Sequence, residues 1–127
     1  MSGEFSPAVR DQVDQRSMGR CEICGAYPGT EYHHRRPRRA GGSRAADTGT
    51  ASNCLLLCSA AGTSKCHEFV ESRRALSILM GWLLTQYATP AVNSVVYRGE
   101  RVFLTEGGGI NLAVVDPSGS QLHWGAV

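Results

Sequence analysis

The amino-acid sequence predicts a single domain of the α+β class. A chain of 127 residues with 42% hydrophobic and 19% charged residues has the size and composition of one globular domain. Helical periodicity is confined to the first and middle parts, whereas short β-rich segments separated by glycines fill the last third. Between the helical parts, residues 21–66 show little periodicity and contain all five cysteines. We therefore expect the cysteines, rather than a hydrophobic core alone, to hold this part together.

A short helix is predicted for residues 7–17. Ser6 is a favourable N-cap, and Pro7 suits the first helical position because proline has no amide hydrogen to lose there. The helix is expected to end near Gly19, just before the first cysteine.

The remaining elements are short. Residues 53–58 form an apolar run that predicts a brief strand or turn, and residues 67–79 have the period of a helix ended by Gly81. Glycine turns then separate three predicted strands at 94–97, 101–104 and 110–115. Within the single domain 1–127, residues 16–80 are expected to form the metal-stapled core. Residues 90–115 are expected to form a small antiparallel appendage that caps this core.

Positive charge is concentrated in one stretch. The net charge of +2 is too small to indicate nucleic-acid binding by itself. However, five arginines fall within ten residues: Arg35, Arg36, Arg38, Arg39 and Arg44. Arginine grips phosphate well, so these residues are candidate phosphate ligands; the alternative is a solvated basic loop. The first residues include no apolar signal region, and no apolar run is long enough to span a bilayer. We expect an intracellular protein outside the membrane.

Four of the cysteines have the spacing of a zinc site. Cys21 and Cys24 form a CxxC knuckle, and Cys58 and Cys66 follow downstream. In a reducing compartment such thiols more often bind metal than form disulfides, so we predict a structural zinc. Buried inert thiols, or a redox pair at the CxxC, are the alternatives. Cys54 lies in an apolar run and is expected to be a small buried hydrophobe.

The stretch "EYHHRRPRR" places His33 and His34 side by side among arginines. If residue 67 opens a helix, His67 and Glu71 lie on one face one turn apart and can chelate a divalent ion, with His33 adding a third ligand from a loop. Such a nitrogen-and-carboxylate set suits Mg²⁺, Mn²⁺, Ni²⁺ or Zn²⁺. Alternatively, Glu71 pairs with Arg74 across a solvated helix face.

The order of these motifs resembles the HNH endonuclease family. More narrowly, it is similar to small zinc-containing HNH proteins of phages that infect actinobacteria. The resemblance covers about residues 16–74. It rests on the CxxC knuckle, His33-His34, Pro37, Gly41-Gly42, Asn53, the run 55–58 and Cys66-His67.

The resemblance implies an HNH ββα-metal core and a role for each matching residue. His34 matches the general base that activates water, and Asn53 matches the asparagine that braces the loop carrying that base. His33 and His67 match ligands of the catalytic metal. Glu31, three residues before His34, matches a carboxylate that orients the base in the colicin nucleases.

Two features depart from the family pattern. Glu71 stands where the colicin nucleases have a histidine ligand, which leaves the metal preference open. The seven residues between Cys58 and Cys66 exceed the common CxxC spacing.

The resemblance implies a metal-dependent DNA endonuclease that nicks or cuts both strands. It further implies action in the cytoplasm of an infected bacterium, beside the large terminase subunit during genome packaging. Because cutting both strands often takes two sites, we expect a monomer or a weak dimer. The alternative from another class is a zinc-ribbon module that binds DNA or a protein without chemistry. A third is a thiol redox protein that uses Cys21 and Cys24.

Overall fold

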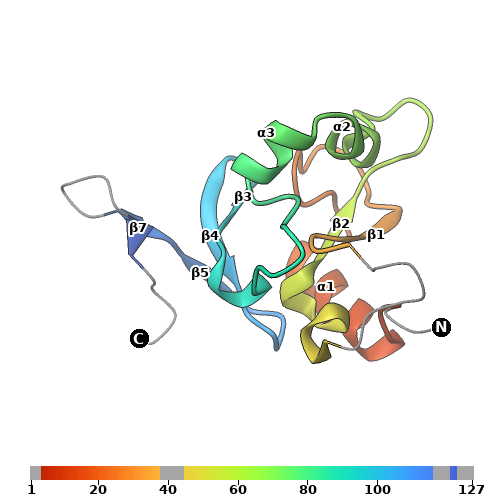
Figure 1. Ribbon diagram of the computed structural model, residues 1–127. Helices are drawn as coiled ribbons and strands as arrows, with labels where there is room; N and C mark the ends of the chain where they lie inside the picture. The colour runs from red at the N-terminus through yellow and green to blue at the C-terminus, as the bar shows by residue number, and fades with distance from the viewer. Residues whose placement is uncertain (1–3, 38–44, 116–120, 123–127) are drawn as a thin grey trace.

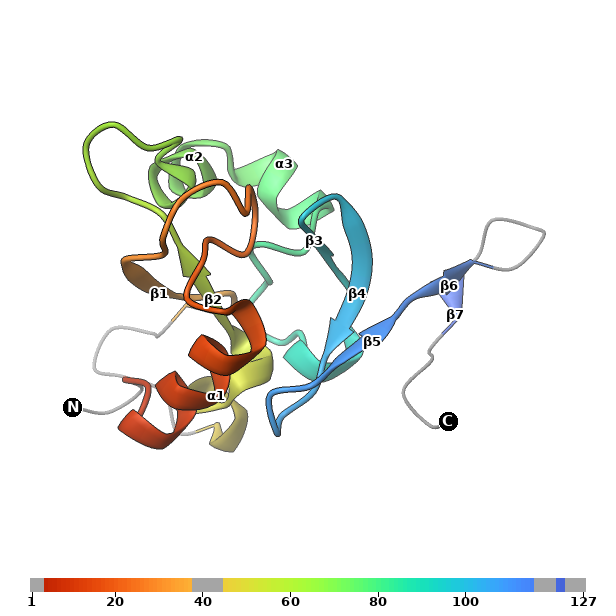
Figure 2. The same cartoon turned by 180° about the vertical axis from the view of Figure 1, so that it is seen from behind.

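A computed structural model describes residues 4–37, 45–115 and 121–122, which form a mixed helix-and-sheet structure of the predicted α+β class (Figures 1 and 2). Its helices and strands are, in chain order, α1 (Pro7–Ser17), β1 (Glu31–His34), β2 (Cys54–Leu57), α2 (Cys66–Ser72), α3 (Arg74–Leu79), β3 (Val95–Tyr97), β4 (Glu100–Leu104), β5 (Ile110–Leu112), β6 (Val114–Val115) and β7 (Gln121–Leu122). Short 3-10 helices occupy Ala46–Gly49, Ala51–Asn53 and Pro90–Val92.

Helix α1 begins and ends where the sequence predicts. The Ser6 hydroxyl accepts a hydrogen bond from the backbone N–H of Val9 at 3.2 Å, and Pro7 occupies the first turn. The helix ends at Ser17, and Gly19 just beyond it has a left-handed φ of +74°. Local capping signals therefore set both ends of this helix.

Strands β1 and β2 pair antiparallel and lie between α1 and α2 (Figures 1 and 2). In their register His33 lies opposite Leu55, and His34 opposite Cys54. The strand at 54–57 agrees with the prediction, but β1 was not predicted, and the expectation that His33 lies in a loop is wrong. The segment Glu31–His34 carries no apolar alternation, because its one buried position is held by His33 rather than by an aliphatic side chain.

The single helix predicted over 67–79 is two helices. The chain breaks at Arg73, whose φ of −124° and ψ of 67° are not helical. The hydroxyl of Ser77 donates to the carbonyl of Val70 at 2.9 Å, replacing the amide that a continuous helix would supply. Helix α3 then ends in the motif expected of Gly81, with φ +77° at the glycine and the Trp82 N–H donating to the carbonyl of Ser77 at 2.9 Å.

The C-terminal strands form an antiparallel sheet in the order β3-β4-β5. The turn between β3 and β4 is Arg98–Gly99, and both residues have positive φ, of 49° and 89°. The third predicted strand, 110–115, is divided into β5 and β6, and β6 pairs with β7.

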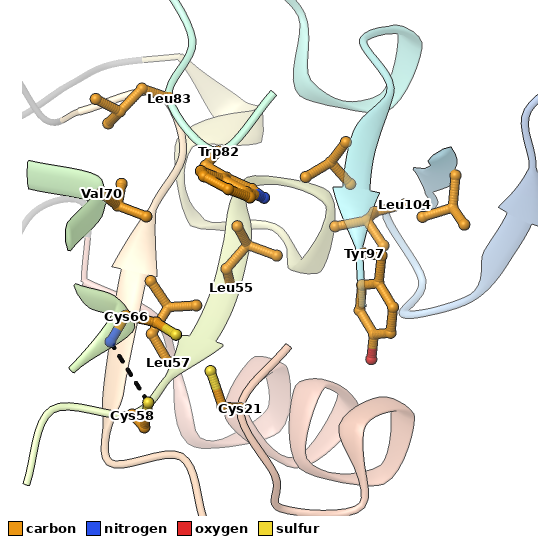
Figure 3. Packing of buried hydrophobic residues seen from close by; sticks show 12 residues of the cluster. Cys21, Leu55, Leu57, Cys58, Cys66, Val70, Trp82, Leu83, Tyr97 and Leu104 are labelled. Atoms are coloured by element: carbon orange, nitrogen blue, oxygen red, sulfur yellow. Dashed lines mark hydrogen bonds between the residues drawn. The ribbon is translucent and has the colours of Figure 1, made fainter. Parts of the chain in front are cut away.

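One apolar cluster joins this sheet to the cysteines. Val95 and Leu104 from the sheet are fully buried in the same cluster as Cys21, Leu55 and Trp82. Figure 3 shows Leu104, Trp82, Leu55 and Cys21 of this cluster. The indole N–H of Trp82 also donates to the carbonyl of Val96 at 2.8 Å. The C-terminal sheet therefore supplies one wall of the core around the cysteines.

Candidate metal centres

Four cysteines converge beside the β1–β2 pair, and their sulfur atoms all lie within 4.8 Å of one another. Cys21 and Cys24 come from the turn after α1, Cys58 directly follows β2, and Cys66 is the first residue of α2. This confirms the predicted metal-binding set, and its four thiols fit the tetrahedral coordination of structural zinc. Cys54 lies apart in a second apolar cluster, as predicted.

The residues between Cys58 and Cys66 form a loop, and hydrogen bonds join the two ends of this loop. The backbone N–H of His67 donates to the carbonyl of Cys58 at 3.1 Å. The N–H of Cys66 points to the sulfur of Cys58 at 3.4 Å, the contact dashed in Figure 3. These contacts bring both cysteines into the four-cysteine cluster despite the long spacing.

The thiols differ in their affinity for protons. Burial acts to raise the pKa of Cys24, but hydrogen bonds from the Ala26 N–H and the neighbouring thiols outweigh it and lower that pKa to about 7. Burial raises the pKa of Cys21 and of Cys66. Because zinc binds thiolates, metal uptake by this cluster would release protons.

A second group of candidate ligands contains His33, His67 and Glu71. The carboxylate Oε1 of Glu71 lies 3.3 Å from Nε2 of His67 and 4.0 Å from Nδ1 of His33. One ligand atom from each residue falls within 4.8 Å of the others. Two imidazoles and a carboxylate suit a divalent ion with open coordination positions, so the donor set fits the metal that the sequence predicts.

These three residues face an open cavity of about 250 Å³. His34 also lines it, together with Tyr32, Pro37 and Leu83. Exposure of the side chains rises from 3% for His33 through 27% for His67 to 60% for Glu71, so the group is open on one side. A ligand or substrate can therefore reach it from solvent.

His33 is held in one tautomer. Its Nε2 lies 2.8 Å from the backbone carbonyl of Trp82, which can only accept, so Nε2 carries the proton and Nδ1 keeps its lone pair towards Glu71. Burial lowers the pKa of His33 to about 4, and the nearby imidazoles and Arg35 add to this effect. The ring is thus neutral at pH 7, as a metal ligand must be. Sequence analysis missed Trp82, because a backbone carbonyl leaves no signal in the side-chain pattern.

His34 occupies the other face of β1. Its ring stacks on Phe5, with centroids 4.0 Å apart and an angle of 19° between the planes. Glu31 is exposed and, because side chains alternate along a strand, shares its face with His33 rather than with His34. That Glu31 orients His34 therefore stays a prediction. Phe5 was missed because nothing local links it to residue 34.

Asn53 braces the chain that follows His34. Its side-chain Oδ1 accepts from the Arg36 N–H at 2.7 Å, and its Nδ2 donates to the carbonyls of Arg36 and Thr48 at 3.2 and 2.9 Å. The backbone N–H of Arg35 donates to the Asn53 carbonyl at 2.8 Å. Asn53 is fully buried, so these bonds hold the segment in place.

The expected phosphate contacts of Arg35 and Arg36 are contradicted. Arg35 is fully buried and donates to five backbone carbonyls, those of Ser52, Gly81, Pro90, Asn93 and Ser94. Arg36 is 8% exposed and pairs with Asp47. Both guanidinium groups are used inside the protein and are not available to a ligand. Arg38, Arg39 and Arg44 lie outside the described residues.

In the part of the chain that the structure describes, no helix combines the length and apolar character needed to cross a membrane. No protein-family model, no curated protein and no solved structure matches the chain.

Proposed function

We propose that the protein is a metal-dependent DNA endonuclease of the HNH type, which hydrolyses phosphodiester bonds. One observation supports the proposal: three imidazoles and a carboxylate from β1 and α2 line the same open cavity. Of these four groups, those of His33, His67 and Glu71 lie close enough together to share a metal ion. The order of two antiparallel strands followed by a helix agrees with the ββα-metal arrangement that the resemblance implies.

The proposed roles follow from these positions. His33, His67 and Glu71 would hold one divalent ion, which when bound supplies charge stabilisation to the phosphoryl group and the leaving 3′ oxygen. His34, outside that set but at the same cavity, takes the proton from the attacking water. Asn53 keeps the segment after His34 in place.

Phosphate contacts are proposed for Arg38, Arg39 and Arg44, since Arg35 and Arg36 are used internally. Such contacts would hold the DNA backbone without reading its sequence. A zinc-ribbon module without chemistry would use the cysteine cluster alone, and it gives no account of a neutral His33 held 4.0 Å from a carboxylate.

The decisive experiment incubates supercoiled plasmid with the purified protein and Mg²⁺, Mn²⁺ or Ni²⁺. We expect relaxed or linear product, loss of activity with EDTA under conditions that leave the zinc content unchanged, and recovery when the ion is restored. His34→Ala should abolish cleavage while keeping the fold and both metals. A gel shift without product, or cleavage that survives thorough chelation, would exclude the proposed function.

A further inference from the structure

The turn that follows α3 presents two successive backbone carbonyls to β1 and to the residue after it. The carbonyl of Trp82 lies 2.8 Å from Nε2 of His33, and that of Gly81 accepts from Nε of Arg35 at 2.8 Å. His33 belongs to β1, and Arg35 directly follows this strand. Both contacts are buried, because His33 is 4% exposed and Arg35 is fully buried. One short turn therefore holds a candidate metal ligand and the chain next to it.

The same turn is fastened to the C-terminal sheet. The indole N–H of Trp82 donates to the carbonyl of Val96 in β3 at 2.8 Å, and the N–H of Val96 donates to the carbonyl of Met80 at 2.8 Å. A Cβ atom built at Gly81 would lie 2.0 Å from the carbonyl oxygen of Ser94, just before β3. Side chains do not come so close to a backbone oxygen, so the turn can lie against this chain only because residue 81 is glycine.

These contacts connect the sheet to the ligand atom of His33. A metal-binding imidazole takes its direction from the partner of its second ring nitrogen, and here that partner is the Trp82 carbonyl. The other nitrogen, Nδ1, lies 4.0 Å from Oε1 of Glu71. A shift of the turn away from β3 would move the carbonyl, tilt the imidazole and change this separation. The sheet can therefore set the geometry of the metal ligands, although neither ligand set includes any of the described residues of β3, β4 or β5.

We propose that the C-terminal sheet positions His33 for the divalent ion, with Gly81 and Trp82 as the positioning residues that connect them. The proposal rests on the metal site of the proposed function, and it does not depend on cleavage of DNA. It gives the sheet a role beyond covering the core. A sheet that only covered the core would contribute to folding stability, and changes at the turn would then leave the affinity for the ion unaltered in the folded protein.

Alanine at two glycines provides a matched comparison. Gly81 and Gly99 both have a positive φ, of 77° and 89°, so alanine strains the backbone at either position. A Cβ at Gly99, however, meets no atom within 4 Å beyond its chain neighbours. We expect the dissociation constant for Mn²⁺, measured by calorimetry on the zinc-loaded protein, to rise about tenfold in Gly81→Ala. It should stay near the native value in Gly99→Ala.

Trp82→Phe decides the question if Gly81→Ala does not fold. It keeps an aromatic ring in the apolar cluster but loses the N–H that bonds to Val96. The affinity for Mn²⁺ should fall by about threefold, as expected for the loss of one hydrogen bond in the chain of contacts. Val102→Ala, in the same cluster, is the control: it should lower the melting temperature without changing the affinity.

Nitrogen NMR of His33 gives a readout that needs neither Mn²⁺ nor DNA. At pH 7 the ¹⁵N shifts of the imidazole should show the Nε2–H tautomer in the native protein and in Gly99→Ala, and a mixture of tautomers in Gly81→Ala, where the carbonyl acceptor has moved. Purely structural damage would lower the melting temperature without changing the tautomer of the folded protein.

The possible results separate the positioning role from the nuclease. Unchanged Mn²⁺ affinity and tautomer in Trp82→Phe, and in Gly81→Ala where it folds, would overturn the positioning role, and so would a native protein that binds no Mn²⁺. If the affinities follow the expected order but plasmid DNA is never cut, the positioning role stands and only the nuclease fails. Cleavage with equal affinities in all variants would leave the nuclease and remove the positioning role.

Discussion

Arg16 and Glu22 form a buried ion pair joined by two hydrogen bonds. Arg16 Nε and Nη2 donate to the two carboxylate oxygens of Glu22 at 2.7 and 2.8 Å, and both side chains are almost fully buried. The guanidinium also donates to the carbonyls of Ala51 and Cys54, and Glu22 accepts from the N–H of Leu56 at 2.8 Å. Since Glu22 lies between the cysteines of the knuckle, the pair ties that knuckle to α1 and β2.

Glu22→Gln should therefore destabilise the protein strongly. The neutral amide leaves the buried Arg16 without a countercharge, and breaking one partner of a buried pair costs about 3–5 kcal/mol. Denaturant unfolding monitored by circular dichroism measures the loss. Glu100→Gln, at an exposed carboxylate of β4, is the control and should change stability little. An equal effect in the two variants would refute the stabilising role of the pair.

Arg35→Lys should also be destabilising, although it conserves the charge. Burial lowers the pKa of Arg35 to about 9, so the group is still a cation at neutral pH. An ammonium has three donors and cannot serve five carbonyls in different directions, and each buried acceptor left unpaired costs about 1–3 kcal/mol. Unfolding measurements should show this loss, whereas Arg20→Lys, at an exposed arginine bound to two carbonyls, should show little. Similar stabilities for both variants would contradict the interpretation.

Substitution of a cysteine should affect zinc binding only if that cysteine belongs to the four-cysteine cluster. Cys24→Ser removes a sulfur ligand, so the purified protein should lose its zinc and unfold at lower temperature, because metal binding contributes to folding stability. Cys54→Ala should keep one zinc per chain, since Cys54 lies outside the cluster. Metal content by atomic absorption and thermal unfolding test both expectations. Zinc retained in full by Cys24→Ser would remove that residue from the ligand set.

The two carboxylates of α2 provide a matched pair for the second metal. Glu71→Gln should lower the affinity for Mn²⁺, measured by calorimetry, by about tenfold or more. Even the loss of a residue that only hydrogen-bonds to a metal ligand lowers metal affinity about 10–100-fold. Glu68→Gln should leave the affinity unchanged, because Glu68 bonds to the Ser59 hydroxyl and not to the histidines. Equal affinities in the two variants would exclude Glu71 as a ligand.

Stability should depend on pH differently in the native protein and in His33→Gln, when the second metal is absent. Burial lowers the folded-state pKa of His33 from 6.5 to about 4, so between these values the unfolded chain takes up a proton that the folded protein does not. The native protein should therefore lose stability relative to the variant as pH falls through this window, by on the order of 3 kcal/mol in total. Below it the difference should stay constant.

Glutamine is chosen because its amide can donate to the Trp82 carbonyl as the imidazole does, but it does not titrate. The zinc cluster and all other groups are common to both proteins, so their contributions cancel in the difference. Denaturant titrations across the pH range provide the curves. Parallel curves would show that His33 does not carry a lowered pKa.

Features with a local cause were predictable from the sequence. Ser6 and Pro7 predict the start of α1, because helix capping is local and needs no tertiary contact. The cysteine set and the pairing of His67 with Glu71 follow from residue type and spacing, and the structure brings both sets together.

Features that depend on distant backbone were not predictable. Arg35 looks like a phosphate ligand in sequence, yet it is buried because carbonyls from residues 52, 81, 90, 93 and 94 converge on it. At the break at Arg73, the hydroxyl of Ser77 donates to the carbonyl of Val70, seven residues earlier. No periodicity in the sequence reveals such partners, since a carbonyl belongs to every residue.

The pairing of β1 with β2 has an evolutionary consequence. Neighbours on a strand face opposite ways, so the offset that puts His33 across from Leu55 also decides which imidazole meets the Trp82 carbonyl and which meets Phe5. Deleting one residue of β1 ahead of the histidines would turn each imidazole to the opposite face of the strand. Both histidines would remain in the sequence, but each would lose its present contact. Descendants of this chain should accordingly vary in length in the loop between Cys58 and Cys66 and hardly ever within 31–34.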